Sequence, residues 1–323
     1  MFKYSAITGT LKRLGYDFLE TPEVVLEAIK AAGYDAVDLP GDPQSINIKT
    51  MRKLVDSAGL EISEIQAAWA FHHAGESRDL AAEDEESRRR GIDYGKKCVD
   101  LAADLGGKYV EVCPTQNPIP EIPYTKLPLH TLRNNFLASA REIAKYALER
   151  KINILFEPLN RYEAYPGVLN TVYDAINLID DLGLPNLGIQ PDVYHMNIAE
   201  ASIVKALRAA GHRIQVMHMR ETNDYFMGEG HADYYAIIKV LMEIDFDGYF
   251  SVYMPLIPRE LSYRAGSDET VLKLDLRTVL EKQLLFLKAI ERSIEKQSSI
   301  YCAEAPYISK KEIEETKGAT DIY

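Results

Sequence analysis

The sequence is short of cysteine, of basic relative to acidic residues, and of long apolar runs. Its 323 residues include three cysteines, Cys98, Cys113 and Cys302, an odd and widely spaced set that predicts no disulfide framework and fits a reducing cytoplasm. Lysine and arginine number 37 against 49 aspartates and glutamates, and the net charge of −12 disfavours nucleic acid as a partner. No run of about 18 apolar residues occurs, and residues 1–16 lack the apolar core of a signal peptide. We therefore expect a soluble, cytoplasmic protein without membrane association.

A glycine-rich phosphate loop after an early strand is also missing, and a doubly wound dinucleotide-binding sheet would need one. The chain instead alternates short apolar runs with longer stretches of helical period. The predicted strands are 2–9, 36–39, 61–71, 109–113, 152–156, 187–190, 214–219 and 248–254. The predicted helices are 22–33, 47–59, 81–106, 129–150, 169–182, 202–210, 234–244 and 276–294. This pattern predicts an α/β fold, a single (β/α)8 TIM barrel, with the doubly wound sheet as the alternative.

The chain has no linker rich in Pro, Gly or Ser, so the barrel is predicted to span residues 1–297 as one catalytic domain. Residues 298–323 follow the last predicted helix and are rich in Glu, Lys and Thr. We interpret them as a C-terminal tail, or alternatively as an arm that packs on a partner. A homo-oligomer or a complex with a second subunit is the expected state.

Polar side chains stand at the ends of predicted strands five, six and seven, where (β/α)8 enzymes hold their catalytic groups. Strand five ends in Glu157, strand six runs into Asp192, and strand seven contains His218. Gln190 has the same orientation as Asp192 but lies deeper in the predicted barrel. Burying a carboxylate is costly unless a cation neutralises it or it transfers protons. Two carboxylates and an imidazole suit a hard divalent cation, so we predict a site for Mn²⁺, with Mg²⁺ or Co²⁺ as alternatives.

Further candidates for a base or an extra ligand lie on strands three, four and eight. His72 and His73 are adjacent, so at most one of them can face the barrel mouth. Glu111 is interpreted as an acid/base or as a group that orients a metal ligand. Cys113 is interpreted as a small buried apolar residue rather than a nucleophile. Tyr253 would reach the site only if strand eight carried a bulge.

Four segments carry a resemblance to a known family: residues 157–163 (EPLNRYE), 192–198 (DVYHMNI), 218–221 (HMRE) and 228–234 (GEGHADY). In order and spacing they resemble sugar isomerases and epimerases of the xylose-isomerase-like barrel superfamily, with the nearest likeness to the ketose 3-epimerases. The resemblance implies that Glu157, Asp192 and His218 bind the metal. It also implies that Glu163 and His195 contact sugar hydroxyls.

The sequence departs from that family at strand eight. The family has a second glutamate there, which completes the metal shell and serves as the other acid/base, whereas this chain has Met254. A thioether is a poor ligand for a hard cation and carries no proton. Asp224 stands near the place of a substrate-contacting arginine of the family. The departure favours chemistry that needs one base, namely deprotonation beside a sugar carbonyl followed by isomerisation or elimination.

We therefore predict a metal-dependent lyase or isomerase acting on a sugar or a 3-oxo-sugar. The sequence also resembles the catalytic subunit of C-glycoside deglycosidases, which deprotonate a 3-oxo-glucosyl substrate beside its ketone and expel the carbon-linked aglycone. The expected partners are a small-molecule sugar or glycoside and, by this resemblance, a small β-rich subunit. The alternatives are a ketose 3-epimerase or sugar isomerase, and a sugar-binding scaffold subunit that has lost catalysis.

Overall fold

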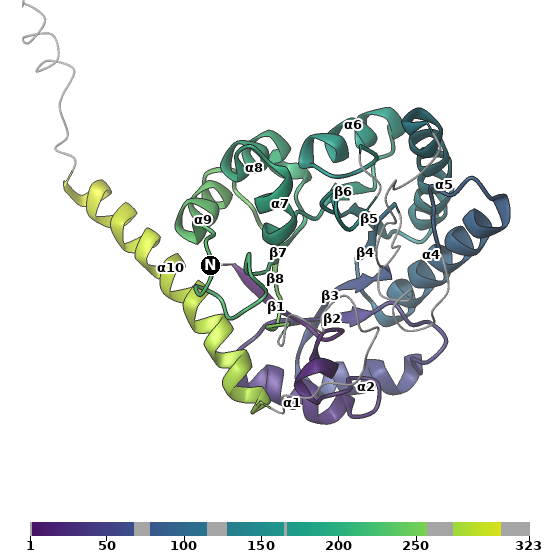
Figure 1. Ribbon diagram of the computed structural model, residues 1–323. Helices are drawn as coiled ribbons and strands as arrows, with labels where there is room; N and C mark the ends of the chain where they lie inside the picture. Colours follow the sequence, from purple (N-terminus) through teal and green to yellow (C-terminus); the bar gives the residue numbers. More distant parts are fainter. Residues whose placement is uncertain (1, 68–77, 115–127, 165–166, 257–273, 305–323) are drawn as a thin grey trace, which may run out of the picture.

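The computed structural model describes residues 2–67, 78–114, 128–164, 167–256 and 274–304, in which eight parallel strands form a ring with helices outside it (Figure 1). The strands are β1 Lys3–Ile7, β2 Ala36–Pro40, β3 Glu61–Gln66, β4 Tyr109–Val112, β5 Asn153–Phe156, β6 Leu187–Ile189, β7 Val216–Met219 and β8 Tyr249–Val252. Their order is β6-β5-β4-β3-β2-β1-β8-β7, and two parallel bridges, Ile189–Ile214 and Asp192–His218, connect the two ends of this sheet. The predicted (β/α)8 barrel is confirmed.

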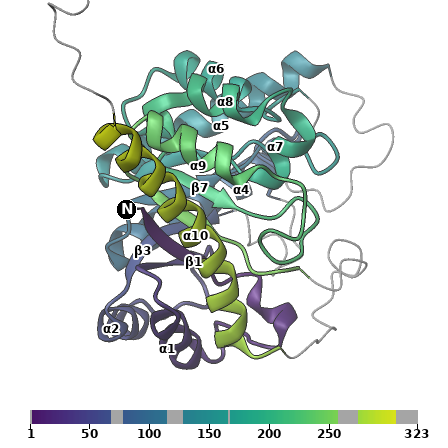
Figure 2. The ribbon, with the colours of Figure 1, turned by 90° about the vertical axis from the view of Figure 1, so that its left-hand side faces the viewer.

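The helices follow the strands around the outside of the barrel. They are α1 Pro22–Ala32, α2 Ile48–Ala58, α4 Glu85–Leu105, α5 Leu129–Glu149, α6 Val172–Leu182, α7 Val193–Ala199, α8 Ile203–Ala210, α9 Tyr234–Glu243 and α10 Leu276–Glu304, with short 3₁₀ turns at Leu11–Leu14 and Gly211–Arg213. The last helix, α10, crosses the outside of the barrel beside β1 and packs against both α1 and α9 (Figure 2).

Several helix ends differ from the prediction, and capping residues explain most of the differences. Helix α4 begins at Glu85 rather than at residue 81, because the Asp84 side chain accepts a hydrogen bond from the Ser87 amide at 2.7 Å. Helix α6 begins after Thr171, whose side chain forms a capping box with Asp174. Helix α10 continues past residue 294 to Glu304, since the next helix-breaking residue is Pro306.

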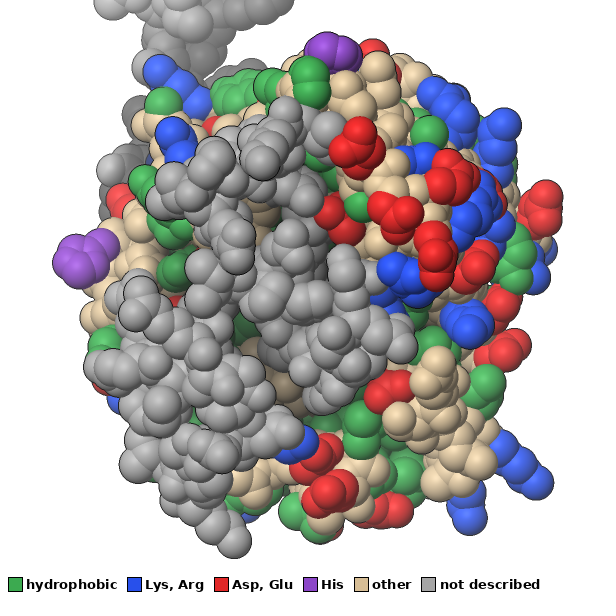
Figure 3. Space-filling model, turned by 45° about the vertical axis from the view of Figure 1, so that its right-hand side comes forward, with side chains coloured by type: hydrophobic (Ala, Val, Ile, Leu, Met, Phe, Trp, Pro, Cys, Tyr) green, Lys and Arg blue, Asp and Glu red, His purple; other side chains and the backbone are tan. Residues whose placement is uncertain are grey.

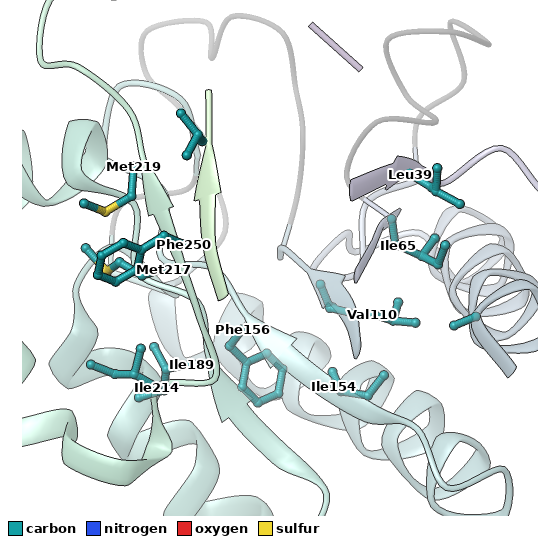
Figure 4. Packing of buried hydrophobic residues seen from close by; sticks show 14 of the residues in the cluster. Leu39, Ile65, Val110, Ile154, Phe156, Ile189, Ile214, Met217, Met219 and Phe250 are labelled. Carbon is teal, nitrogen blue, oxygen red and sulfur yellow. The ribbon is translucent and has the colours of Figure 1, made fainter. Parts of the chain in front are cut away.

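The outer faces of the strands are covered by apolar side chains (Figure 4). Phe156 on β5 packs edge-on against Phe136 of α5, with 5.9 Å between ring centroids. Burial of a side chain of this size contributes about 1.5–3 kcal/mol. Because side chains alternate along a strand, the outward Phe156 requires that Leu155 and Glu157 point into the barrel.

The inside of the barrel is built in layers. Its floor is a small apolar cluster of Ala36, Leu155, Val216 and Tyr249. Two residues farther along the same four strands come buried polar residues: Asp38, Glu157, His218 and Ser251. The polar site therefore lies one layer above an apolar floor, toward the carboxyl ends of the strands.

Strand β3 carries a β-bulge next to β2. Val37 pairs with Ile62, but Asp38 pairs with Glu64, so Ser63 is an extra residue on β3. The hydroxyl of Ser63 hydrogen-bonds inside the barrel to Asp38 and, at 2.6 Å, to the hydroxyl of Ser5. A bulge changes the direction of the side chains that follow it. The next residue here is Glu64, which points into the barrel and contacts His218.

Acidic and basic side chains are interspersed over part of the outer surface (Figure 3). Ion pairs connect neighbouring helices, such as Arg89 of α4 with Glu142 of α5 at 2.7 Å. Among the described helices, none combines the length and the apolar character needed to cross a membrane.

Candidate metal centre

Glu157, Asp192 and His218 meet inside the mouth of the barrel. Glu157 follows β5, Asp192 follows β6 and His218 belongs to β7, and at most 4% of each residue is exposed. Nδ1 of His218 lies 3.0 Å from Glu157 Oε1 and 3.7 Å from Asp192 Oδ2. The parallel bridge between Asp192 and His218 holds the ends of β6 and β7 in this register. The structure thus brings together the three residues that were predicted as metal ligands.

Asp192 has one oxygen engaged and one free. Its Oδ1 accepts hydrogen bonds from the amides of Tyr194 at 2.7 Å and His195 at 3.4 Å and so caps α7. Its Oδ2 is buried and has no hydrogen-bond partner among the described residues. A buried carboxylate oxygen that lacks a hydrogen bond is costly. Together with the carboxylate of Glu157 and the imidazole of His218, it forms a donor set that fits a hard divalent cation.

The other ring nitrogen of His218, Nε2, contacts the carboxylate of Glu64, a residue that was not predicted from the sequence. Oε1 of Glu64, on β3, lies 2.9 Å from His218 Nε2 and also accepts a hydrogen bond of 2.9 Å from the amide of Gln190. His218 therefore lies between Glu64 on one side and Glu157 on the other. Burial disfavours the imidazolium, but these two carboxylates raise the pKa of His218 well above its usual value.

Glu111, the residue before the last one of β4, lies beside Glu157. The thiol of Cys113 connects them, with Sγ 3.3 Å from Glu111 Oε1 and 3.5 Å from Glu157 Oε2. Burial, and then the negative charges of Glu157 and Glu64, raise the pKa of Glu111 well above its usual value. Burial also opposes ionisation of Glu157, but the charge and hydrogen bond of His218 outweigh it and lower the pKa of Glu157 to about 2. The pair can therefore consist of one carboxylate and one carboxylic acid.

His195 and Glu163 lie next to this centre and are connected through Asn160. The side-chain and backbone N–H groups of Asn160 approach His195 Nδ1 at 2.8 and 3.3 Å, which places the ring proton on Nε2. The same side chain donates to Glu163 Oε1 at 3.1 Å. Ligand atoms of His195, Glu157 and Asp192 all lie within 4.8 Å of one another. The two residues expected to contact sugar hydroxyls are thus grouped at the edge of the centre.

Tyr253, and not Met254, is the residue after β8 that meets the centre. The ring of Tyr253 contacts His218 edge-on, with 5.2 Å between centroids, although β8 pairs in regular register with both neighbours. Met254 belongs to the main apolar cluster and is 1% exposed. Within the described residues, β8 supplies no carboxylate to the site.

Arg220 and Asp224 form a buried ion pair just beyond β7. Nε of Arg220 donates to Asp224 Oδ1 at 2.7 Å. The guanidinium lies 3.9 Å from the ring centroid of Tyr194 and 5.1 Å from that of Tyr253. Asp224 therefore holds an arginine at the barrel mouth between two aromatic rings. The remaining two candidates, His72 and His73, lie outside the described residues.

Comparison with known proteins gives consistent results. The family model described as "Xylose isomerase-like TIM barrel" matches residues 26–273. A ketose 3-epimerase of Arthrobacter globiformis is 27% identical over 288 residues, which cover 82% of this chain and 92% of the relative. A 3-dehydro-D-guloside 4-epimerase of Escherichia coli is 26% identical over 234 residues, covering 71% and 86%. Among solved structures, an L-ribulose 3-epimerase has a TM-score of 0.77 at 22% identity and covers 95% of this chain and 99% of its own.

Proposed function

The chain belongs to the xylose isomerase-like TIM barrel family, and from this premise we propose that it is a metal-dependent enzyme that removes a proton beside the carbonyl of a keto-sugar. We propose more specifically that it cleaves a carbon-linked aglycone from a 3-oxo-glycoside by elimination, as a lyase. The relatives named above are epimerases of ketoses and of a 3-dehydro sugar. They support an enzyme of keto-sugar chemistry.

The observation that carries the proposal is the pairing of Glu111 with Glu157 through Cys113. These two acids come from neighbouring strands. Glu111 lies on β4 in register with Leu155 of β5, and Glu157 directly follows β5. They therefore approach a substrate in the mouth from one side. Epimerisation with two bases requires groups on opposite faces of the reacting carbon, and the residue after β8 that meets the centre is Tyr253. The arrangement suits an elimination, in which one group takes a proton and an adjacent one gives a proton back.

The elimination balances without an oxidant or a reductant. A 3-oxo-C-glycoside has an acidic hydrogen on the carbon between its ketone and its anomeric carbon. Glu157 would take this proton to give an enolate, and the bond from the anomeric carbon to the aglycone would then break, which leaves a conjugated enone. The aglycone departs with the bonding electron pair and takes one proton, which Glu111 would supply.

Glu157, Asp192 and His218 would hold the metal, and we propose Mn²⁺, with Mg²⁺ or Co²⁺ as substitutes. When bound, such a cation polarises a carbonyl and stabilises the negative charge of an enolate. The protein residues would do the rest: Glu163 and His195 would bind hydroxyls, and Arg220 between two tyrosines would border the space for the aglycone. We also propose a cytoplasmic location, which the few and widely spaced cysteines support. We further propose a complex with a second copy of the chain or, on the resemblance stated above, with a small β-rich subunit.

A ketose 3-epimerase is the second candidate, favoured by the 27% identity that extends over 82% of the chain. Product analysis separates the two. The Mn²⁺-loaded protein is incubated with a 3-oxo-C-glycoside and, separately, with ketohexoses. The proposal expects free aglycone and an enone from the first and no 3-epimer from the second. Rapid epimerisation of a ketose with no aglycone release would replace the lyase by the epimerase, and turnover of neither substrate, with or without a co-purifying subunit, would favour a sugar-binding scaffold.

A further inference from the structure

We propose that Glu64 is a positioning residue that determines which ring nitrogen of His218 faces Glu157 and Asp192. The inference rests on the proposed function, because it requires His218 to be a metal ligand. Glu64 Oε1 lies 2.9 Å from His218 Nε2, while Nδ1, across the ring, lies 3.0 Å from Glu157 Oε1. Glu64 lies outside all four segments that resemble the ketose 3-epimerases, so the resemblance assigns it no role.

The bulge in β3 is what brings Glu64 to His218. In a regular strand, Ser63 and Glu64 would point to opposite faces, and only one could enter the barrel. Here the extra residue lets both enter: Ser63 contacts Asp38 and Ser5, and Glu64 contacts His218. Bulges of this kind re-aim side chains next to active sites. Without this contact, Glu64 would be a buried carboxylate with an uncompensated charge, which is costly. The bulge brings Glu64 into the barrel, and His218 gives its carboxylate a partner there.

An ionised carboxylate only accepts hydrogen bonds, so the ring nitrogen of His218 that faces Glu64 has to carry a proton. Without metal, both ring nitrogens of His218 face carboxylate oxygens, Nε2 that of Glu64 and Nδ1 that of Glu157, so each nitrogen can carry a proton. A cation held by Glu157 and Asp192 Oδ2 would take the place of the proton on Nδ1, while Glu64 keeps the proton on Nε2. Histidines that bind metals commonly donate their other N–H to a carboxylate, which orients the ring and increases its basicity. Glu64 is placed to do this for His218.

Gln190 makes the choice of proton position sharper. Its amide nitrogen donates to the same oxygen of Glu64 and also contacts His218 Nε2. If Gln190 donated to Nε2 instead, the proton would move to Nδ1 and the lone pair would point away from Asp192. Glu64 accepts from both Gln190 and His218, and so favours the arrangement in which Nδ1 is free to bind. Replacing its charge should remove this preference.

The variant Glu64→Gln tests the inference, since it keeps the size of the side chain and removes the charge. Mn²⁺ affinity is measured by titration with detection of free Mn²⁺ by electron paramagnetic resonance. We expect the Mn²⁺ affinity to fall by about 10- to 100-fold, the usual effect of removing a group that hydrogen-bonds to a metal ligand. Glu61→Gln is the matched control, because Glu61 begins the same strand and is bonded to Lys3 on the surface; its affinity should equal that of the wild type. Unchanged affinity in a folded Glu64→Gln would overturn the inference.

A measurement on the wild type makes the test independent of folding of the variants. In the Zn²⁺-loaded protein, ¹⁵N nuclear magnetic resonance of the histidine rings should show His218 with a proton on Nε2 and the metal on Nδ1. A metal on Nε2 would contradict the inference. His218→Ala separates it from the proposed function: if that variant binds Mn²⁺ as tightly as the wild type, the metal site itself is wrong. If His218→Ala loses binding and Glu64→Gln does not, only the role of Glu64 fails.

Discussion

Asp192 Oδ2 lies 3.7 Å from His218 Nδ1 and has no hydrogen-bond partner among the residues that the structure describes. Its other oxygen is engaged by the first amides of α7, so the carboxylate cannot turn away without losing the helix cap. The free oxygen is therefore fixed where a cation would bind it. This relationship underlies the first prediction.

Loss of either member of this pair should weaken metal binding strongly. Asp192→Asn and His218→Ala each remove a direct ligand of the metal. Their Mn²⁺ affinity should therefore fall by more than about 10- to 100-fold, which is the usual loss when only a group that hydrogen-bonds to a ligand is removed. Asp192→Asn can still cap α7 through its amide oxygen, so the fold should be kept. Isothermal titration calorimetry measures the affinity, and binding at wild-type strength in both variants would show that the cation lies elsewhere.

Glu111→Gln should separate proton removal from bond cleavage. The variant keeps Glu157 as base but lacks an acid to protonate the departing aglycone. Deuterium should still enter the position beside the ketone from D₂O, while aglycone release falls by about 10²- to 10⁴-fold, the usual contribution of a general acid. The two rates are measured on one sample by nuclear magnetic resonance and chromatography. If the exchange rate and the release rate fall equally, or if neither falls, Glu111 is not the acid.

Cys113 should contribute to stability because its single S–H lies between two buried carboxyl groups and can donate to one of them. Cys113→Ala leaves Glu111 and Glu157 without this donor, so the free energy of unfolding should fall by about 1–3 kcal/mol. Cys113→Ser keeps a donor and should retain most of the stability. Urea unfolding of the metal-free variants measures the difference, and equal stability of the alanine and serine variants would show that the S–H contributes nothing.

The same thiol should resist alkylation in the folded protein. Burial, and then the charge of Glu111, raise the pKa of Cys113 well above its usual value, and burial raises that of Cys98 to about 12. Because the thiolate is the reactive form, neither residue should react with iodoacetamide at pH 8 until the protein unfolds. Peptide mapping by mass spectrometry tests this, and rapid labelling of Cys98 in native protein would contradict the burial.

Glu142, which lies outside the site, should make the free energy of unfolding depend on pH. Hydrogen bonds from Arg89 and Lys96 lower its pKa to about 2. A lowered folded-state pKa gives stability that is present above the unfolded pKa, about 4.3 for Glu, and that is lost as pH falls toward 2. Glu142→Gln should therefore cost about 0.2–1 kcal/mol at pH 7, the range for exposed ion pairs, and less as the solution is acidified. Glu149→Gln, on the exposed surface of the same helix, is the control; a cost for Glu142→Gln that does not change with pH would contradict the ion-pair account.

The sequence predicted the barrel and the three strand-end residues for a physical reason. Strand alternation places Glu157 inward once Phe156 is outward, and parallel strands bring Glu157, Asp192 and His218 to one end of the sheet. It did not predict α7, which begins where Asp192 acts as its N-cap. Nor did it predict Glu64. The bulge at Ser63 is a tertiary feature, and the local pattern of residues 61–66 carries no signal for it.

Residues after β8 show the same limit. A regular continuation of that strand suggested that Tyr253 would need a bulge to reach the site, yet the strand ends at Val252 and Tyr253 contacts His218 without one. Glu111 was identified from its place at a strand end, but its partnership with Glu157 depends on Cys113, which the sequence indicated only as a buried apolar residue. Contacts between strand ends are decided by packing, and spacing along the chain does not reveal them.

The central claim is that Glu157, beside a bound cation, removes a proton next to a sugar carbonyl. Its most direct test is deuterium exchange from D₂O at that carbon of a 3-oxo-glycoside, followed by nuclear magnetic resonance with wild-type protein, metal-free protein and Glu157→Gln. The account predicts exchange with the Mn²⁺-loaded wild type and none above background with the other two. Exchange that continues at the wild-type rate in Glu157→Gln, with the metal still bound, would contradict it.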